Sequence, residues 1–223
     1  MDKTYEYYLE NWYLEMDLLC TPVARIGLMI TAYYIGFAVG GLMFNWPEKY
    51  GRKNSVLIGM AISIVSQTFM IYWPDFYVRT IAFGGMGLSQ LKNSASYVWA
   101  SECVPLSNKP LAFTMINVFD CFPMPFLCLY FMFISKDWYD LNFYVLLLSY
   151  ISFALTFLCP ESPRWLLVNG RTKDAIDVLN YIARWNGNSF RIPGDAQFVE
   201  DPTSHGVITA PEEKRKRATS LVE

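Results

Sequence analysis

Long runs without a charged side chain are the feature that most limits what this chain can fold into. Three runs of nineteen residues contain no Asp, Glu, Lys or Arg: 26–44, 55–73 and 141–159. A helix of that length covers about 28 Å, close to the ~30 Å thickness of the hydrocarbon layer of a bilayer. Each run is therefore predicted to be a helix that crosses a membrane.

Two further apolar stretches carry a few charges. Residues 77–101 contain Arg79 and Lys92, and residues 111–135 contain Asp120 and the interrupted sequence CFPMPF. Two prolines so close together predict a kinked helix whose freed carbonyl groups lie against protein or water. The predicted fold class is an all-α integral membrane protein with five transmembrane helices and a short amphipathic surface helix.

The composition supports this class and excludes others. The 223 residues are 53% hydrophobic and 17% aromatic, with a formal net charge of −2. A chain without a positive excess gives no reason to expect nucleic acid as a partner. The five cysteines show no CxxC spacing and there is a single histidine, so no metal and no cofactor are predicted. The sequence contains no nucleophile–base arrangement or phosphate loop, so we do not expect an enzyme.

The segment 160–187 begins where the last apolar run ends. Pro160 and Pro163 cannot continue a helix, and Trp165 is an amphipathic ring of the kind found at membrane–water boundaries. Apolar residues then recur at helical spacing until Gly187, which is a common residue after a helix end. We predict a membrane exit, an interfacial anchor and a short amphipathic helix on the membrane surface.

The start of this segment resembles a known family. The string PESPRWLL-x-x-GR opens with Pro160, Glu161, Ser162, Pro163, Arg164 and Trp165. It is similar to the string that follows the sixth transmembrane helix of the organic cation/anion transporters, which belong to the major facilitator superfamily. The resemblance implies that the five predicted helices correspond to helices two to six. It covers about the first half of such a transporter, and we expect the first helix and the second half to be missing.

The loop NWPEKYGRK, residues 45–53, resembles the superfamily signature between helices two and three. The positions that correspond to the signature are Glu48, Lys49, Gly51, Arg52 and Lys53. The resemblance implies charge contacts that latch the cytoplasmic side during the transport cycle. The alternative interpretation is a solvated basic loop that only fixes the orientation of the chain.

Gly36 and Gly40 lie four residues apart within the first apolar run. This G-x-x-x-G spacing places both on one face of a helix, where the lack of side chains allows close approach of another helix. We therefore predict that this face packs against a neighbouring helix.

Lys92 and Asp120 are expected to lie at the same depth. Lys92 comes ten residues before Glu102 and Asp120 ten residues after Pro110, and both helices turn at that inner boundary. At 1.5 Å per residue each group is ~15 Å deep. Because an isolated charge there costs roughly 3 kcal/mol, we predict that the two pair or share a water-filled cavity. They form a candidate substrate or proton site, and the alternative is a structural ion pair between helices.

Arg79 and the glycines that follow it resemble the superfamily's fourth helix, which opens with an arginine. The resemblance implies that Arg79 lines the transport pathway, so it is a third candidate for the site. The alternative is that its side chain extends to the membrane surface, because it lies near a helix end.

These patterns divide the chain into four segments. They are a polar and aromatic interfacial lead-in (1–25), a five-helix transmembrane bundle (26–159), the PESPR turn with its amphipathic surface helix (160–187) and an extended polar tail (188–223). Seven basic residues flank one side of the bundle: Lys49, Arg52, Lys53, Lys109, Arg164, Arg171 and Lys173. Four flank the other: Lys3, Arg25, Arg79 and Lys136. This asymmetry predicts that the PESPR side faces the cytoplasm or an equivalent compartment.

Two functions from different classes are compatible with the sequence. The first is a non-transporting accessory or structural subunit of a larger membrane complex. We favour it, because a facilitator works by rocking two six-helix halves against each other and this chain offers five helices. The alternative is a transporter of organic ions that works as a dimer or with a second half-transporter, which the charges at Arg79, Lys92 and Asp120 favour.

The expected partners follow from these functions. They are the lipid bilayer, other membrane-protein subunits in a hetero-oligomer and, as a candidate ligand, an organic ion. A multi-pass integral membrane location is expected in either case. The membrane would be the mitochondrial inner membrane for a subunit of an organellar complex, and the plasma membrane for a transporter.

Overall fold

The computed structural model describes most of the chain. The described residues are 12–16, 18–43, 45–187, 191–194, 196–201 and 204–209. They belong to two compact units, Met1–Trp165 and Leu166–Glu223.

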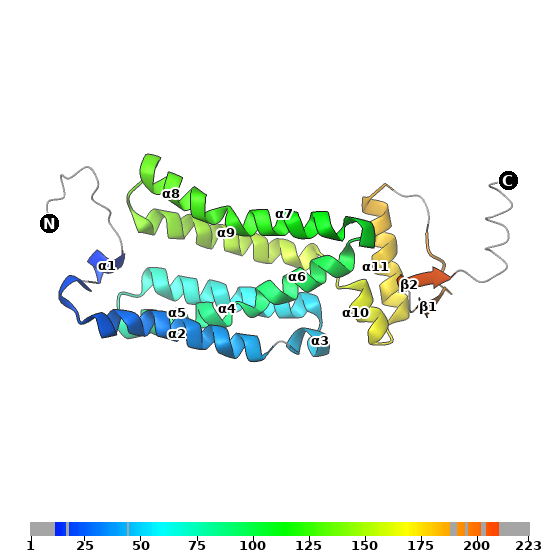
Figure 1. The fold of residues 1–223 in the computed structure, drawn as a ribbon, viewed down its shortest axis with the longest axis horizontal. Coiled ribbons are helices and arrows are strands. Elements are labelled where there is room, and N and C mark those ends of the chain that lie inside the picture. The colour runs from blue at the N-terminus through cyan, green and yellow to red at the C-terminus, as the bar shows by residue number, and fades with distance from the viewer. Residues whose placement is uncertain are drawn as a thin grey trace. The chain divides into compact units, whose positions relative to one another are not determined.

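The described part of the first unit is built from helices (Figure 1). In chain order these are α1 (Trp12–Glu15), η1 (Leu18–Cys20), α2 (Val23–Leu42), α3 (Trp46–Tyr50), α4 (Arg52–Tyr72), α5 (Phe76–Leu88), α6 (Leu91–Cys103), η2 (Leu106–Asn108), α7 (Lys109–Cys121), α8 (Pro123–Phe133) and α9 (Trp138–Leu158). The short helix α10 (Pro163–Val168) crosses the boundary between the units. The all-α membrane fold expected from the sequence is confirmed.

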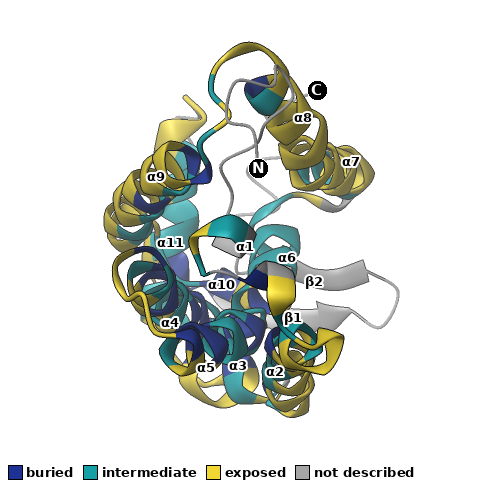
Figure 2. Cartoon of the chain, turned by 90° about the vertical axis from the view of Figure 1, so that its left-hand side faces the viewer, coloured by how far each residue is buried: buried dark blue, intermediate teal, exposed yellow. Residues whose placement is uncertain are grey.

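Within the described residues, four helical stretches are long and apolar enough to cross a membrane. They are Val23–Leu42, Arg52–Tyr72, Lys109–Phe133 and Trp138–Leu158. Many large apolar side chains on these stretches are exposed. Figure 2 shows the exposed residues along α7, α8 and α9. Such a surface is unfavourable in water and suits the hydrocarbon of a bilayer. The chain is therefore an integral multi-pass membrane protein.

The fifth predicted crossing, 77–101, is divided into α5 and α6. The two helices meet at Ser89 and Gln90, where Lys92 and Asn93 donate backbone hydrogen bonds to carbonyls only three residues back. Bonds of this kind mark a tight 3₁₀-type turn within an otherwise α-helical run. Both helices pack against α4, so together they still follow the length of the bundle.

Close packing of α2 against α5 holds one side of the bundle together. Gly36 and Gly40 face α5, and a Cβ atom on Gly40 would lie 2.8 Å from the carbonyl oxygen of Leu88. Gly87 faces α2 in return, where a Cβ would lie 2.9 Å from the backbone nitrogen of Phe37. Both distances are shorter than real Cβ contacts, so the two backbones approach closely because these positions are glycine.

The buried apolar core of this unit consists of small clusters rather than one large mass. Leu18, Met29 and Phe76 form one cluster, with Met16, Ile26 and Phe83 packed around it. Ile64, Ile71 and Leu146 form a second cluster, with Phe153 packed against them. The first joins α2 to α5 and the second joins α4 to α9, so each cluster fixes one helix pair.

The second unit contains α11 (Thr172–Trp185) and a hairpin of β1 (Gln197–Asp201) and β2 (Ser204–Thr209). Asn180 connects α11 to the chain that follows, because its side chain donates to the carbonyl of Ile192 (3.1 Å) and accepts from its backbone N–H (2.8 Å). The hairpin lies where the sequence suggested an extended polar tail. The predictions for 1–11 and for the end of the tail, 210–223, lie outside the described residues. The location of α11 on a membrane surface stays a prediction.

The glycine contact between α2 and α5 predicts a position-specific loss of stability. Gly36→Ala should lower the free energy of unfolding by ~1–3 kcal/mol, because its Cβ meets backbone that cannot move aside. Thermal unfolding of the purified protein in detergent, followed by helical circular dichroism, measures this.

Gly41→Ala is the matched control for this prediction. It lies on the same helix, and a Cβ there would meet nothing within 4 Å. Equal melting temperatures for the two variants would contradict the close packing.

Candidate functional sites

A first polar site surrounds the start of α4 and begins with Gly51. This residue has a φ of 102°, in a region that side-chain-bearing residues rarely adopt. It ends α3 and directly precedes Arg52, the first residue of α4. The turn leaves the first backbone N–H groups of α4 available to partners outside the helix.

Glu161 supplies one such partner. Its Oε1 atom accepts a hydrogen bond from the backbone N–H of Lys53 (2.9 Å) and from that of Ser162 (3.0 Å). A carboxylate at a helix N-terminus also interacts favourably with the helix dipole. The acidic residue of the PESPR string therefore caps a helix more than one hundred residues earlier in the chain.

Arg52 and Ser162 meet at Glu102, the penultimate residue of α6. The Arg52 Nε atom lies 3.5 Å from Oε2 of Glu102, and the Ser162 hydroxyl donates to the same oxygen at 2.6 Å. The side chains of Arg52 and Glu102 are only 14% and 7% exposed, so bulk water screens this ion pair weakly. Glu102 thus links the start of α4, the end of α6 and the PESPR turn.

Two further hydrogen bonds complete the site. The indole N–H of Trp165 donates to the carbonyl of Glu48 (2.7 Å), and the Lys53 ammonium donates to the carbonyl of Phe157 near the end of α9 (2.8 Å). The residues that form this site, which we call the α3–α4 cluster, are Glu48, Gly51, Arg52, Lys53, Glu102, Glu161, Ser162 and Trp165. The structure therefore brings much of the loop signature and much of the PESPR string together. Lys49 and Arg164 are exposed.

Lys92 lies between α4 and α6. Its ammonium donates to the hydroxyl of Ser63 at 2.9 Å and lies 3.5 Å from that of Ser89. Gly59 makes room for it, since a Cβ on Gly59 would lie 2.7 Å from the Cβ of Lys92. Two hydroxyl groups and the absence of a side chain thus accommodate this cation within the helix pair.

Asp120 lies on the opposite side of α6, beside Tyr97. The Tyr97 hydroxyl donates a hydrogen bond to Oδ2 of Asp120 and lies 3.4 Å from Oδ1 of Asn117. The Tyr97 ring stacks against Phe113, with ring centroids 6.3 Å apart. Asp120 is exposed, so this group of four residues, which we call the Asp120 cluster, is open to a ligand.

The predicted pairing of Lys92 with Asp120 is not formed. The structure gives each a separate partner, and no ion pair joins them in the described part of the chain. Lys92 and Tyr97 are five residues apart on one helix, which turns their side chains by about 140° relative to each other. The residue count concerned how deep Lys92 and Asp120 lie in the membrane, and it did not address the direction in which each side chain leaves its helix.

Arg79 is buried, with 2% of its surface exposed, and does not extend to the membrane surface. Its Nε donates to the carbonyl of Trp73 and its Nη2 to Oε1 of Glu15, both at 2.7 Å. The guanidinium also lies over the ring of Trp138, 5.6 Å from the centroid. A cavity of about 140 Å³ adjoins these groups.

The sequence did not single out several of these partners. Glu102 appeared only as the end of an apolar run, and Tyr97, Asn117 and Ser63 gave no signal of their own. The spacing of Gly59 and Ser63, one helical turn apart, is a signal that could have indicated a place for a long polar side chain in a neighbouring helix.

The structure and the sequence comparisons agree on the class of protein. The pattern of the family described as "Sugar (and other) transporter" matches residues 2–201, most of the chain. The protein therefore belongs to this family of membrane transporters, within the major facilitator superfamily.

Curated relatives give the branch of the family to which the chain is similar. It is 27% identical to organic cation/carnitine transporter 2 of Rattus norvegicus over 81% of this chain and 33% of the relative. It is 26% identical to organic cation transporter 1 of Caenorhabditis elegans, over 97% and 37%. It is 28% identical to the beta-alanine transporter of Drosophila melanogaster, over 92% and 34%. The chain thus spans about a third of the length of these relatives, all of which are named as transporters.

The α3–α4 cluster predicts a local change in hydrogen exchange. Glu161→Ala removes the acceptor of the Lys53 amide, and a hydrogen bond to a charged group is worth ~1.5–3 kcal/mol. Exchange at Lys53 should therefore become roughly 10–100 times faster when measured by residue-resolved hydrogen–deuterium exchange.

Arg164→Ala is the control, since Arg164 is exposed in the same turn. It should leave exchange at Lys53 unchanged. An unchanged rate in Glu161→Ala would show that the carboxylate does not cap α4.

Proposed function

We propose that this chain takes part in moving a small organic cation across a membrane, with the Asp120 cluster as the site that contacts it. Membership of a transporter family supports the class of activity. The single observation that carries the choice of substrate is an exposed carboxylate in a membrane-crossing stretch without a basic partner among the described residues.

The cost of that carboxylate explains why it points to a ligand. A charged Asp at the centre of a membrane-spanning helix costs roughly 3 kcal/mol on insertion scales. Asp120 lies near the middle of the stretch Lys109–Phe133, and the Tyr97 hydroxyl hydrogen-bonds it but leaves its charge unbalanced. A cationic substrate would balance the charge.

The surroundings of Asp120 favour an organic cation over a metal ion. The stacked rings of Tyr97 and Phe113 provide aromatic surface, which attracts alkylammonium groups through their π electrons. The carboxamide of Asn117 adds a neutral polar group within reach of the Tyr97 hydroxyl. Two of the three relatives reported above are named for organic cations, which supports the same substrate class.

The α3–α4 cluster would serve as the latch of such a carrier. Its hydrogen bonds and ion pair connect three helix ends at one end of the bundle. Each of these contacts is polar and involves at least one side chain, so the contacts can break and re-form as helices tilt. The orientation of this end toward the cytoplasm rests on the distribution of basic residues.

A non-transporting subunit is the second candidate, and the surface of α7 and α8 favours it. Tyr130 is the one buried residue of these two helices, and Figure 2 shows both as exposed along most of their length. Helices of another membrane protein could cover that surface as well as lipid could. Purification of the native protein in mild detergent tests this candidate, which predicts co-migration with other chains at fixed stoichiometry.

The cation hypothesis is tested by binding and uptake of tetraethylammonium, a quaternary ammonium probe. Purified protein in lipid vesicles should bind it saturably and take it up, and Asp120→Asn should weaken binding by about tenfold or more. Tyr97→Phe keeps the ring but removes the hydroxyl, so its effect should be smaller.

Asp140→Asn is the matched control, because Asp140 is an exposed carboxylate in the first turn of α9. It should bind the probe as the unmodified protein does. Binding that is equally strong in Asp120→Asn, or absent in the unmodified protein, would contradict the proposal.

A further inference from the structure

We propose that the cavity beside Arg79 is a second binding site, separate from the Asp120 cluster, and that it takes a small carboxylate with a short aliphatic chain. The proposal rests on the donors of Arg79, on the walls of the cavity and on its size.

The donors of Arg79 are only partly satisfied. A guanidinium has five N–H groups, and those of Nε and Nη2 have acceptors at Trp73 and Glu15. Nη1 is buried and has no hydrogen-bond partner in the part of the chain that the structure describes. The side chain is 2% exposed, so bulk water does not reach this nitrogen. A buried donor without an acceptor is costly, which indicates that an acceptor is supplied by something that enters the cavity.

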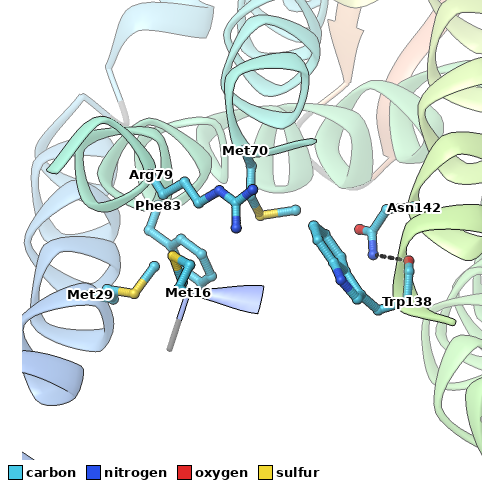
Figure 3. A pocket seen from close by; sticks show the side chains of 7 residues that line it. All are labelled: Met16, Met29, Met70, Arg79, Phe83, Trp138 and Asn142. Carbon is cyan, nitrogen blue, oxygen red and sulfur yellow. Dashed lines mark hydrogen bonds between the residues drawn. The ribbon is translucent and has the colours of Figure 1, made fainter. Parts of the chain in front are cut away.

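The walls of the cavity are mainly apolar. Its lining residues are Met16, Met29, Met70, Arg79, Phe83, Trp138 and Asn142. Figure 3 shows the Arg79 guanidinium extending toward Met70 and Trp138. The Asn142 amide donates to the Trp138 carbonyl at 2.8 Å and fixes the start of α9 beside the cavity. Three thioethers and a phenyl ring form a surface that adapts well to an aliphatic chain.

The same walls argue against water as the occupant. A buried water makes two to four hydrogen bonds, and among the described lining residues Arg79 and Asn142 supply the polar groups at one part of the wall, so water elsewhere in the cavity would lack partners. A single carboxylate, in contrast, matches the planar fork of a guanidinium and can place its alkyl part against the methionines. One end of the ligand would thus be charged and the other apolar.

The cavity volume limits the ligand to a small molecule. At about 140 Å³ it is close to the ~150 Å³ of an engineered cavity that holds benzene. A molecule of roughly six non-hydrogen atoms therefore fits, which is the size of butyrate. Aromatic acids and long-chain dicarboxylates contain more non-hydrogen atoms and exceed this volume.

Glu15 sets the strength of the site. It pairs with Arg79 from α1, and its side chain is 45% exposed, so its carboxylate is partly hydrated while Arg79 is buried. A ligand carboxylate would share the guanidinium with Glu15, and the two negative charges would repel each other. Removal of the Glu15 charge should therefore strengthen anion binding.

Equilibrium binding of labelled butyrate to the full chain in lipid nanodiscs tests the proposal. Butyrate should bind saturably, and n-butanol, which has the same chain length without a charge, should bind about tenfold more weakly or worse. Glu15→Gln keeps a hydrogen-bond acceptor for Nη2 and should tighten butyrate binding several-fold, by roughly three to ten times. The Asp140→Asn control should not.

A cavity-filling variant tests the location without changing Arg79. Met70→Phe should weaken butyrate binding by about tenfold or more, since it places a larger side chain in the cavity. Met124→Phe, on the exposed surface of α8, should have no effect. Equal binding of butanol and butyrate would overturn the proposal, as would binding that is indifferent to both Glu15→Gln and Met70→Phe.

The two sites are distinguished by testing the variant of each site with the ligand of the other site. Asp120→Asn should leave butyrate binding unchanged, and Met70→Phe should leave tetraethylammonium binding unchanged. Butyrate binding that is lost in Asp120→Asn would overturn the assignment of butyrate to the Arg79 cavity.

Discussion

Charged groups among apolar helices must find partners, and this requirement determines much of the structure. Arg52 meets Glu102, Arg79 meets Glu15, and Lys92 is held by hydroxyl groups of Ser63 and Ser89. Each of these contacts lies at a helix end or between two neighbouring helices. Asp120 and Lys92 both have neutral hydrogen-bond partners and no balancing charge within the described residues, but Asp120 is exposed whereas Lys92 is half-buried between two helices. Its exposed, unbalanced charge is what makes Asp120 the proposed contact for a cation.

Glycines make these pairings geometrically feasible. Gly36, Gly40 and Gly87 allow α2 and α5 to approach at backbone distance, and Gly59 gives Lys92 its place against α4. Gly51 turns the chain so that Glu161 can cap α4. Small residues thus determine where helices meet, and polar residues then fix the meeting points. The buried apolar core of the bundle is small and is divided into separate clusters.

The sequence predicted the helices well and the partners of charged residues less well. Uncharged runs and prolines predicted the membrane-crossing helices, because length and hydropathy alone decide whether a helix can span a bilayer. The division of α5 from α6 at Ser89 was not predicted, since a 3₁₀ turn leaves no strong sequence mark. The Lys92–Asp120 pair was wrong because depth along a helix says nothing about direction around it. The link between Glu161 and Lys53 spans more than one hundred residues, so only the fold could place it.

The proposed function requires that the Asp120 carboxylate is accessible and takes an organic cation. Modification by a carbodiimide, a reagent that labels carboxyl groups in apolar surroundings, measures this directly when the labelled residue is identified by peptide mapping. The account predicts that Asp120 is labelled and that tetraethylammonium slows its labelling while leaving that of Asp140 unchanged. Labelling of Asp120 at the same rate with and without tetraethylammonium would contradict it.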